Sequence, residues 1–165
     1  MRARPSVPAP PRLYRRTLLD ETGGFDEDFF LIYEDADLSL RARLLGARCL
    51  FVPDATVYHR VNYSIGTFSH NYVFFGQRNS EYVFWKNLPF PLLLLRFPER
   101  ILFDSLAFFY FMGKGRGLSF IKGKISFLRN FQAVMRKRKK IQQTRKIPWR
   151  ELDRLLDRNW LKNRL

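Results

Sequence analysis

Residues 23 to 46 read GGFDEDFFLIYEDADLSLRARLLG, a stretch that combines a turn signal with an unusual concentration of acid. Eight of the fifteen acidic residues of the chain lie between Asp20 and Asp37. The two glycines can take positive φ angles at little cost, which predicts a sharp turn at the start of the stretch. We expect the aromatic side chains that follow to anchor this turn in a core; they are Phe25, Phe29 and Phe30.

A helix is predicted after the turn, because Leu38, Ala42 and Leu45 share one helical face. Glu34 and Asp35 then stand at its N-terminus, where capping and the helix dipole favour carboxylates even without a function. Asp37 and Arg41 have the spacing of a helical ion pair. A capped surface helix is therefore one interpretation of these acids. A functional site is the other interpretation, since clustered carboxylates mark a functional site in some proteins.

Three motifs follow one another along the chain: GGFDEDFF, EDADLSLR and LLGARCLFVPDATVYHR. Together they resemble the C-terminal half of the catalytic domain of family 2 glycosyltransferases, which are inverting enzymes of the GT-A fold. Within that family the motifs look most like the rhamnosyltransferase-type members that build bacterial cell-surface polysaccharides. The resemblance runs from about residue 13 to about residue 87. It implies an α/β fold class, the C-terminal portion of a GT-A fold, with strands near 13–17, 49–52 and 56–59 and amphipathic helices after them.

The resemblance also implies roles for residues of the first two motifs. Asp35 would be the general base that takes the proton of the acceptor hydroxyl, and Glu34 would orient the acceptor. Gly24, Phe25 and Asp26 would shape the acceptor side of the site. The reaction would move a sugar from a nucleotide-sugar donor to a lipid-linked or polysaccharide acceptor.

Two further residues are assigned by the same resemblance. Arg78 would reach a diphosphate oxygen of the donor through a charge-assisted hydrogen bond, and a solvated helix face is the equal alternative. His59 would complete the coordination of Mn²⁺ or Mg²⁺, and imidazole suits Mn²⁺ better. A lone histidine is otherwise more often structural. The family's Asp-X-Asp metal motif belongs to a donor-binding half with no counterpart here, so the chain is expected to have little activity unless another chain supplies that half.

The positive charge lies in the last third of the chain. Residues 1–111 hold 13 Lys or Arg against 12 Asp or Glu, a net charge of +1, whereas residues 112–165 hold 17 against 3, a net charge of +14. Basic and aromatic residues interleave over 120–140, which predicts a helix in the headgroup layer of an anionic membrane. The alternatives are a solvated charged helix and a non-enzymatic module that binds nucleic acid through residues 112–165, although no nucleic-acid motif is recognised.

The predicted organisation has three regions. Residues 1–12 contain four prolines and are expected to be a disordered lead-in. Residues 13–87 would be the catalytic half, and residues 88–165 a basic helical region that associates with the membrane. Helices are predicted at 68–87, 99–112, 118–143 and 149–161, with a flexible basic turn between 113 and 117.

The expected location is the cytoplasmic face of the cell membrane. The single cysteine, Cys49, cannot form an internal disulfide, which indicates a reducing compartment. No secretory signal is recognised, and charged residues interrupt the apolar stretch 88–112, so no membrane span is predicted.

Overall fold

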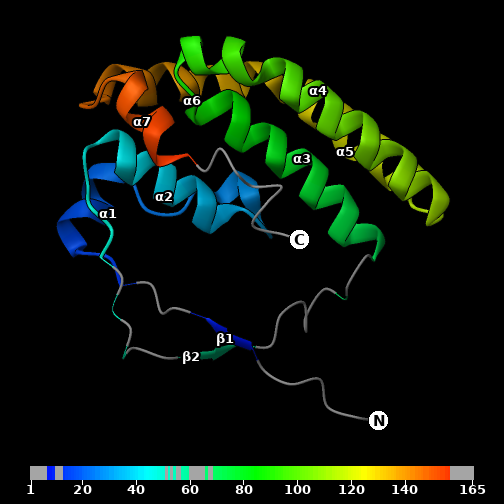
Figure 1. The fold of residues 1–165 in the computed structure, drawn as a ribbon, viewed down its shortest axis with the longest axis horizontal. Helices are drawn as coiled ribbons and strands as arrows, with labels where there is room; N and C mark the ends of the chain where they lie inside the picture. The colour runs from blue at the N-terminus through cyan, green and yellow to red at the C-terminus, as the bar shows by residue number, and fades with distance from the viewer. Residues whose placement is uncertain are drawn as a thin grey trace.

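The computed structural model describes residues 7–9, 13–50, 52, 54, 57–59, 66 and 69–156, with the backbone alone at 7–9 and 57–59. Within these residues the fold is a bundle of helices arranged around α3 (His70–Asn87), as Figure 1 shows. The other elements, in chain order, are β1 (Val7–Ala9), α1 (Arg16–Thr22), the 3₁₀ turn η1 (Glu27–Phe29), α2 (Glu34–Leu44), β2 (Val57–His59), α4 (Phe90–Gly113), α5 (Gly117–Arg129), α6 (Phe131–Thr144) and α7 (Trp149–Leu155).

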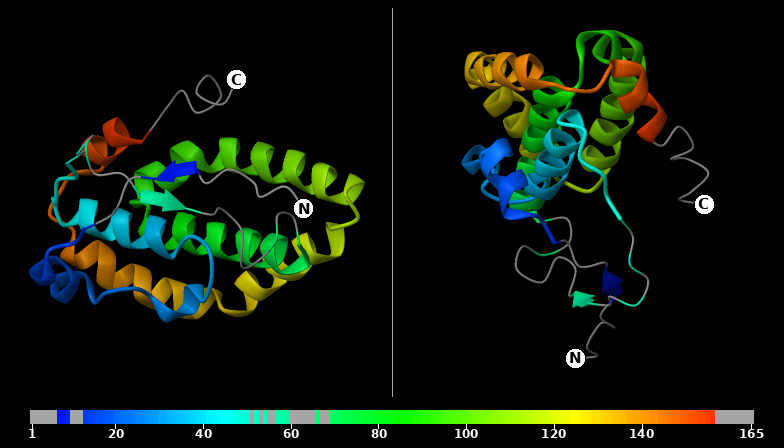
Figure 2. Two further views of the ribbon diagram at one scale, coloured as in Figure 1. Left: turned by 90° about the horizontal axis from the view of Figure 1, so that it is seen from below. Right: turned by 90° about the vertical axis from the view of Figure 1, so that its left-hand side faces the viewer.

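The predicted α/β fold class is wrong for the described residues. Their strands are β1 and β2, three residues each, which pair antiparallel with Val7 opposite His59. This pair lies apart from the helices in Figure 1 and in the right panel of Figure 2. A helical bundle and one short strand pair do not make a portion of a GT-A sheet.

The expected strand at 13–17 is replaced by the start of α1. Arg16 and Asp20 form an i, i+4 ion pair with Nε and Oδ1 3.0 Å apart. The helix ends at Gly23, which has φ 77°, and the amide of Gly24 donates to the carbonyl of Leu19 at 2.9 Å. A helix satisfies its own backbone groups locally, whereas a lone strand would leave them unpaired, and this explains the difference.

The other predicted strands fare differently. Residues 49 and 50 have no regular structure, and Phe51 lies outside the described residues. Of the strand predicted at 56–59, residues 57–59 form β2. Residues 1–6 and 10–12 of the predicted lead-in also lie outside the described residues.

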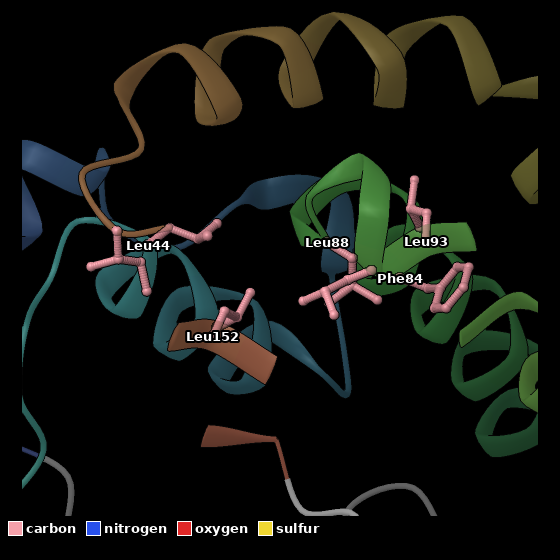
Figure 3. Close-up of a cluster of buried hydrophobic side chains, with 7 residues drawn as sticks. Leu44, Phe84, Leu88, Leu93 and Leu152 are labelled. Carbon is pink, nitrogen blue, oxygen red and sulfur yellow. The ribbon is translucent and has the colours of Figure 1, made fainter. Parts of the chain in front are cut away.

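Three apolar clusters hold the bundle together, and α3 contributes to each of them. The first joins α3 to α2, α4 and α7 through Phe84, Leu44, Leu93 and Leu152, with Leu88 beside them (Figure 3). The other two each combine a side chain of α3 with apolar residues of other elements: Tyr82 with Phe29, Phe127 and Val134, and Val73 with Phe111 and Phe120.

Most predicted helices are confirmed, with different boundaries. Helix α4 begins at Phe90 and not near residue 99, because Pro91 is tolerated in a first helical turn, and it continues past Pro98. The helix predicted at 118–143 is broken at Asn130 into α5 and α6. None of the helices in the described part of the chain has the length and apolar character needed to cross a bilayer. The division of the chain at residue 87 stays a prediction.

Candidate functional site

The acidic stretch begins with the predicted turn. Gly23 and Gly24 have φ angles of 77° and 70°. Of the three aromatic residues expected to anchor the turn, only Phe29 is buried. Phe25 and Phe30 are 56% and 80% exposed, so the prediction is wrong for both.

The backbone just before Glu34 and Asp35 is strained. Phe30, Ile32 and Tyr33 have φ angles of 42°, 66° and 72°, although none of them is glycine. Left-handed backbone costs such residues about 1–2 kcal/mol each, most of all a β-branched residue such as Ile32. Strain of this kind persists only where neighbouring structure enforces it, and it is concentrated at functional sites.

Helix α3 enforces this conformation through one buried side chain. The Nδ2 atom of Asn79 donates to the carbonyls of Phe29, Leu31 and Ile32 at 2.8, 2.6 and 2.8 Å. Asn79 is fully buried, so its side chain makes these hydrogen bonds away from solvent. The amide group therefore fixes the path of the chain into α2.

Arg78, the predicted diphosphate ligand, supports the same segment. Its Nη2 donates to the carbonyl of Asp28 at 2.8 Å, and its Nε donates to Oδ1 of Asn79 at 2.9 Å. The guanidinium also lies over the ring of Phe75, with 4.9 Å between its central carbon and the ring centroid. These contacts give Arg78 a structural role, and the contact with diphosphate stays a prediction.

Glu34 and Asp35 occupy the first turn of α2, where the structure leaves them half-buried. The Oδ1 atom of Asp35 accepts a hydrogen bond from the amide of Ala36 at 2.7 Å. Oε2 of Glu34 is shielded from solvent and has no hydrogen-bond partner among the described residues. A buried carboxylate oxygen without a donor costs free energy, and a hydroxyl donor from a bound molecule would remove that cost.

Asp37 has a different role from its two neighbours. It is fully buried and accepts from Arg41 Nε at 2.8 Å, from Asn87 Nδ2 at 2.7 Å and from Lys86 Nζ at 2.7 Å. The predicted pair of Asp37 with Arg41 is thus present. Arg41 also donates to the carbonyls of Thr22 and Gly24 at 2.7 and 2.8 Å, which ties the glycine turn to α2.

Asp26, a predicted acceptor-side residue, is held between two lysines. Its Oδ2 lies 2.5 Å from Lys86 Nζ and its Oδ1 lies 2.6 Å from Lys137 Nζ. Burial on its own would raise the pKa of Asp26, but the hydrogen bonds from Lys137 and Lys86 outweigh burial and lower the pKa from 3.8 to about 2. Asp26 is therefore ionised at neutral pH and joins α3 and α6 to the turn.

A shallow, open depression of about 450 Å³ borders the glycine turn. Its lining consists of Gly23 and Gly24 with three residues of α1, namely Arg16, Leu19 and Asp20. Gly24, predicted to shape the acceptor side, therefore faces a concave surface. The acceptor roles of Gly24, Phe25 and Asp26 stay predictions.

The predicted metal site is not assembled by the described side chains. His59 lies in β2, and its side chain is outside the described part of the structure. Among the described residues, no three His, Cys, Asp or Glu side chains gather as a metal ion would require. Asp37, the third acid of the EDAD motif, is already occupied by Arg41, Lys86 and Asn87. The described side chains therefore do not form a complete metal site, and the requirement for Mn²⁺ or Mg²⁺ stays a prediction.

The basic segment 120–140 places part of its apolar residues inside the bundle. Phe120, Phe127 and Val134 are buried. Lys137 binds the acidic turn, and Arg138 Nη1 donates to the carbonyls of Trp85 and Leu88, both at 2.6 Å. Burial lowers the pKa of Arg138. The charged residues of this segment on the exposed surface are Lys122, Arg129, Arg136, Lys139 and Lys140.

Sequence patterns alone did not identify the residues of α3 that bind and support the acidic segment. Lys86 and Asn87 reach Asp37 across about fifty positions of sequence, and Asn79 reaches Phe29 across a similar separation. No local pattern reports such contacts. The one available signal was the presence of polar residues within an otherwise aromatic helix.

Comparison with known proteins gives a partial match. No known protein family and no solved structure matches the chain. Similar curated proteins include the N-acetylglucosaminyl-diphospho-decaprenol L-rhamnosyltransferases of Mycobacterium tuberculosis strains CDC 1551 / Oshkosh and ATCC 25618 / H37Rv, each 36% identical over 77 residues. The match covers 41% of this chain and 25% of each relative. The chain thus spans about a quarter of the length of these relatives, and the similarity supports a relationship to glycosyltransferases at a coarse level.

Proposed function

We propose that this chain carries the acceptor side and the general base of a glycosyltransferase. The relatives are named for the transfer of L-rhamnose to N-acetylglucosaminyl-diphospho-decaprenol, so the proposed acceptor is a lipid-linked sugar diphosphate and the proposed donor a nucleotide-sugar. Membership of family 2 and the identity of both substrates are part of this proposal.

The proposed reaction is an in-line displacement at the anomeric carbon of the donor sugar. A hydroxyl oxygen of the acceptor forms the new bond to that carbon, and the bond to the nucleotide diphosphate breaks, so the diphosphate leaves with the bonding electrons. The hydroxyl proton passes to the carboxylate of Asp35. Glu34 accepts a hydrogen bond from the acceptor through its buried Oε2 and holds the hydroxyl in place.

The observation that carries this proposal is the strained segment in front of the two acids. Three non-glycine residues with positive φ lead directly into Glu34 and Asp35. A helix cap alone does not require such backbone, because ordinary capping residues adopt extended angles. The hydrogen bonds from Asn79 maintain a costly geometry whose effect is to set where α2 begins and where its first two carboxylates stand.

Acceptor binding is the part of the proposal that these 165 residues can test alone. We expect the chain to bind a short-chain N-acetylglucosaminyl-diphospho-prenol, measured by isothermal titration. Glu34→Gln should weaken binding at least fivefold, whereas Glu27→Gln, a change at an exposed acid of η1, should leave it within twofold. No binding, or equal binding by both variants, would contradict the acceptor role of Glu34.

The base is tested separately by transfer. We expect Asp35→Asn to keep acceptor affinity within twofold and to abolish sugar transfer to the same acceptor from a nucleotide-activated rhamnose when a donor-binding partner is supplied. Transfer by Asp35→Asn at the parent rate would exclude Asp35 as the base. Titration of the chain with a nucleoside diphosphate and Mn²⁺ should show no tight binding, because the described side chains do not gather the ligands of a metal ion.

A further inference from the structure

Helix α4 exposes an apolar surface along its whole length. Of its 24 residues only Leu92, Leu93 and Phe111 are buried. Leu102 is 62% exposed and Phe109 is 71% exposed. The other large apolar side chains exposed on this helix are Phe90, Leu94, Leu95, Phe97, Ile101, Phe103, Leu106, Tyr110 and Met112. Exposed apolar side chains in this number along one helix of a folded chain indicate a binding face.

The outer face of α5 extends this surface and adds positive charge. Helix α5 follows α4 after a short turn and packs beside it (Figure 1). Its buried face contains Phe120, Gly123 and Phe127. Lys122 and Arg129 are exposed, and by helical spacing they share the opposite face with four exposed apolar residues: Leu118, Ile121, Ile125 and Leu128.

The acids of α4 each lie beside a cation. Glu99 lies 3.1 Å from Arg96, which also pairs with Asp153 at 2.7 Å. Asp104 lies 3.0 Å from Arg100 and 2.8 Å from Lys124. Helix α5 contains no acidic residue. The surface formed by α4 and the outer face of α5 is therefore apolar with a positive margin.

A second copy of the chain would cover this surface poorly. Symmetric pairing places equivalent patches against each other, so Lys122 and Arg129 would meet a patch with the same net positive charge. An anionic bilayer supplies what the surface lacks: an apolar layer for the leucine and phenylalanine side chains and negative headgroups for the lysine and arginine side chains.

We propose that the surface of α4 and the outer face of α5 lies flat on an anionic lipid bilayer. The apolar side chains of α4 enter the boundary between headgroups and acyl chains, and Lys122 and Arg129 contact lipid phosphates. Within the region 88–165 that sequence predicted to associate with the membrane, this inference assigns the contact to α4 and the outer face of α5, and not to the basic run of α6. It does not depend on the proposed sugar transfer, although a protein on this surface would meet a lipid-linked acceptor.

Vesicle flotation tests the proposal with matched variants. The whole chain should float with phosphatidylglycerol vesicles and be retained at least tenfold less by phosphatidylcholine vesicles. Leu102→Asp with Phe109→Asp should lower flotation at least tenfold. Gln132→Asp with Gln143→Asp, which adds the same charge to exposed positions of α6, should change it less than twofold. Circular dichroism shows whether each variant is folded.

A charge-reversal pair separates the outer face of α5 from the basic run of α6. Lys122→Glu with Arg129→Glu should release the chain from phosphatidylglycerol vesicles, whereas Arg136→Glu with Lys139→Glu should not, although the net charge changes equally. The reverse pattern would overturn the assignment to α5. Equal loss in both pairs would show that only total charge matters and would also overturn it.

A fluorescence measurement places the face in the bilayer without disrupting it. Phe109→Trp should shift its emission to shorter wavelength when phosphatidylglycerol vesicles are added, after subtraction of the parent chain's emission, and Gln132→Trp should show no shift. If Leu102→Asp with Phe109→Asp instead converts a dimer into a monomer in sedimentation and leaves flotation unchanged, the surface is a contact between copies and the proposal fails.

Discussion

Asn79 shows how one side chain can set the geometry of a distant segment. It lies in α3, yet its Nδ2 atom donates hydrogen bonds to three backbone carbonyls of the segment that precedes α2. These are the carbonyls of Phe29, Leu31 and Ile32. The segment has positive φ at Phe30, Ile32 and Tyr33, so its backbone would relax without this donor. Asn79 therefore acts on Glu34 and Asp35 as a positioning residue.

Replacing this residue should have a large effect on stability. Asn79→Ala removes the donor and leaves buried carbonyls unsatisfied, so we expect the free energy of unfolding to fall by about 2 kcal/mol. Asn71→Ala, at an exposed position of the same helix, should change it by less than about 0.5 kcal/mol. Urea denaturation of the two variants gives the comparison. Equal values would show that Asn79 does not hold the segment.

Asp26 should make stability depend on pH in the acid range. Its folded pKa of about 2 lies below its ordinary value of 3.8, so the unfolded chain binds more protons between these values and stability rises with pH there. The contribution is fully present above pH 4 and is lost as the pH falls toward 2. We expect Asp26→Asn to cost about 1–2 kcal/mol at pH 6, with the difference from the parent chain shrinking by pH 2.5. Glu27→Gln at pH 6 should cost less than about 0.5 kcal/mol.

Among the elements, α3 and α5 make an unusually close contact. A Cβ atom added at Gly123 would lie 2.6 Å from the carbonyl oxygen of Phe74 and 3.1 Å from Cβ of Gln77. The first of these atoms is backbone, so it cannot move without shifting α3. Glycine at this position therefore sets the distance between the two helices.

Two glycine substitutions test this contact. Gly123→Ala should lower the free energy of unfolding by about 2 kcal/mol, because the helices must separate. Gly76→Ala, in the middle of α3 with open space around the added atom, should raise it by up to about 1 kcal/mol, since alanine is the better helix former. Thermal denaturation of the two variants gives the sign of each change in the free energy of unfolding, and opposite signs are expected. Destabilisation by both would mean that helix spacing is not set at Gly123.

Local patterns predicted the helices better than the strands. The apolar spacing around Leu38 is a signal within a few residues, and α2 forms where that signal lies. The helix predicted at 68–87 is likewise present as α3. The strand at 13–17 was expected from a family resemblance, which says nothing about the neighbours a strand needs. Residues 16–23 contain helix signals, namely the i, i+4 spacing of Arg16 and Asp20 and the glycine at position 23 that ends the helix. The chain accordingly forms α1 there and not a strand.

At the scale of the whole molecule, the site depends on charges brought together from three parts of the chain. Lys86 is almost fully buried, and its ammonium group lies between Asp26 and Asp37 and 4.5 Å from the centroid of the Phe29 ring. Sequence placed the acids on the turn and on α2 but could not supply their partner sixty positions away. That partner appears only when the bundle is assembled.

Removal of Lys86 should therefore affect the entire fold. Lys86→Met keeps the length of the side chain but leaves two buried carboxylates without their shared cation, so we expect a loss of about 3 kcal/mol in the free energy of unfolding. Lys139→Met, at an exposed position of α6, should cost less than about 0.5 kcal/mol. Guanidinium denaturation gives both values. A loss below 1 kcal/mol for Lys86→Met would show that Asp37 is sufficiently paired by Arg41 and Asn87.

Helix α3 supplies a side chain to all three apolar clusters. If one cluster opened while the other two stayed packed, part of α3 would be exposed to solvent. Cooperative units of this kind share one opening event. The amide protons at the centre of α3 should then be the last in the described chain to exchange with deuterium, and at the same rate from residue to residue, while those of α4 exchange early from its outward side. A gradient of rates along α3 would indicate three separate unfolding units in place of one.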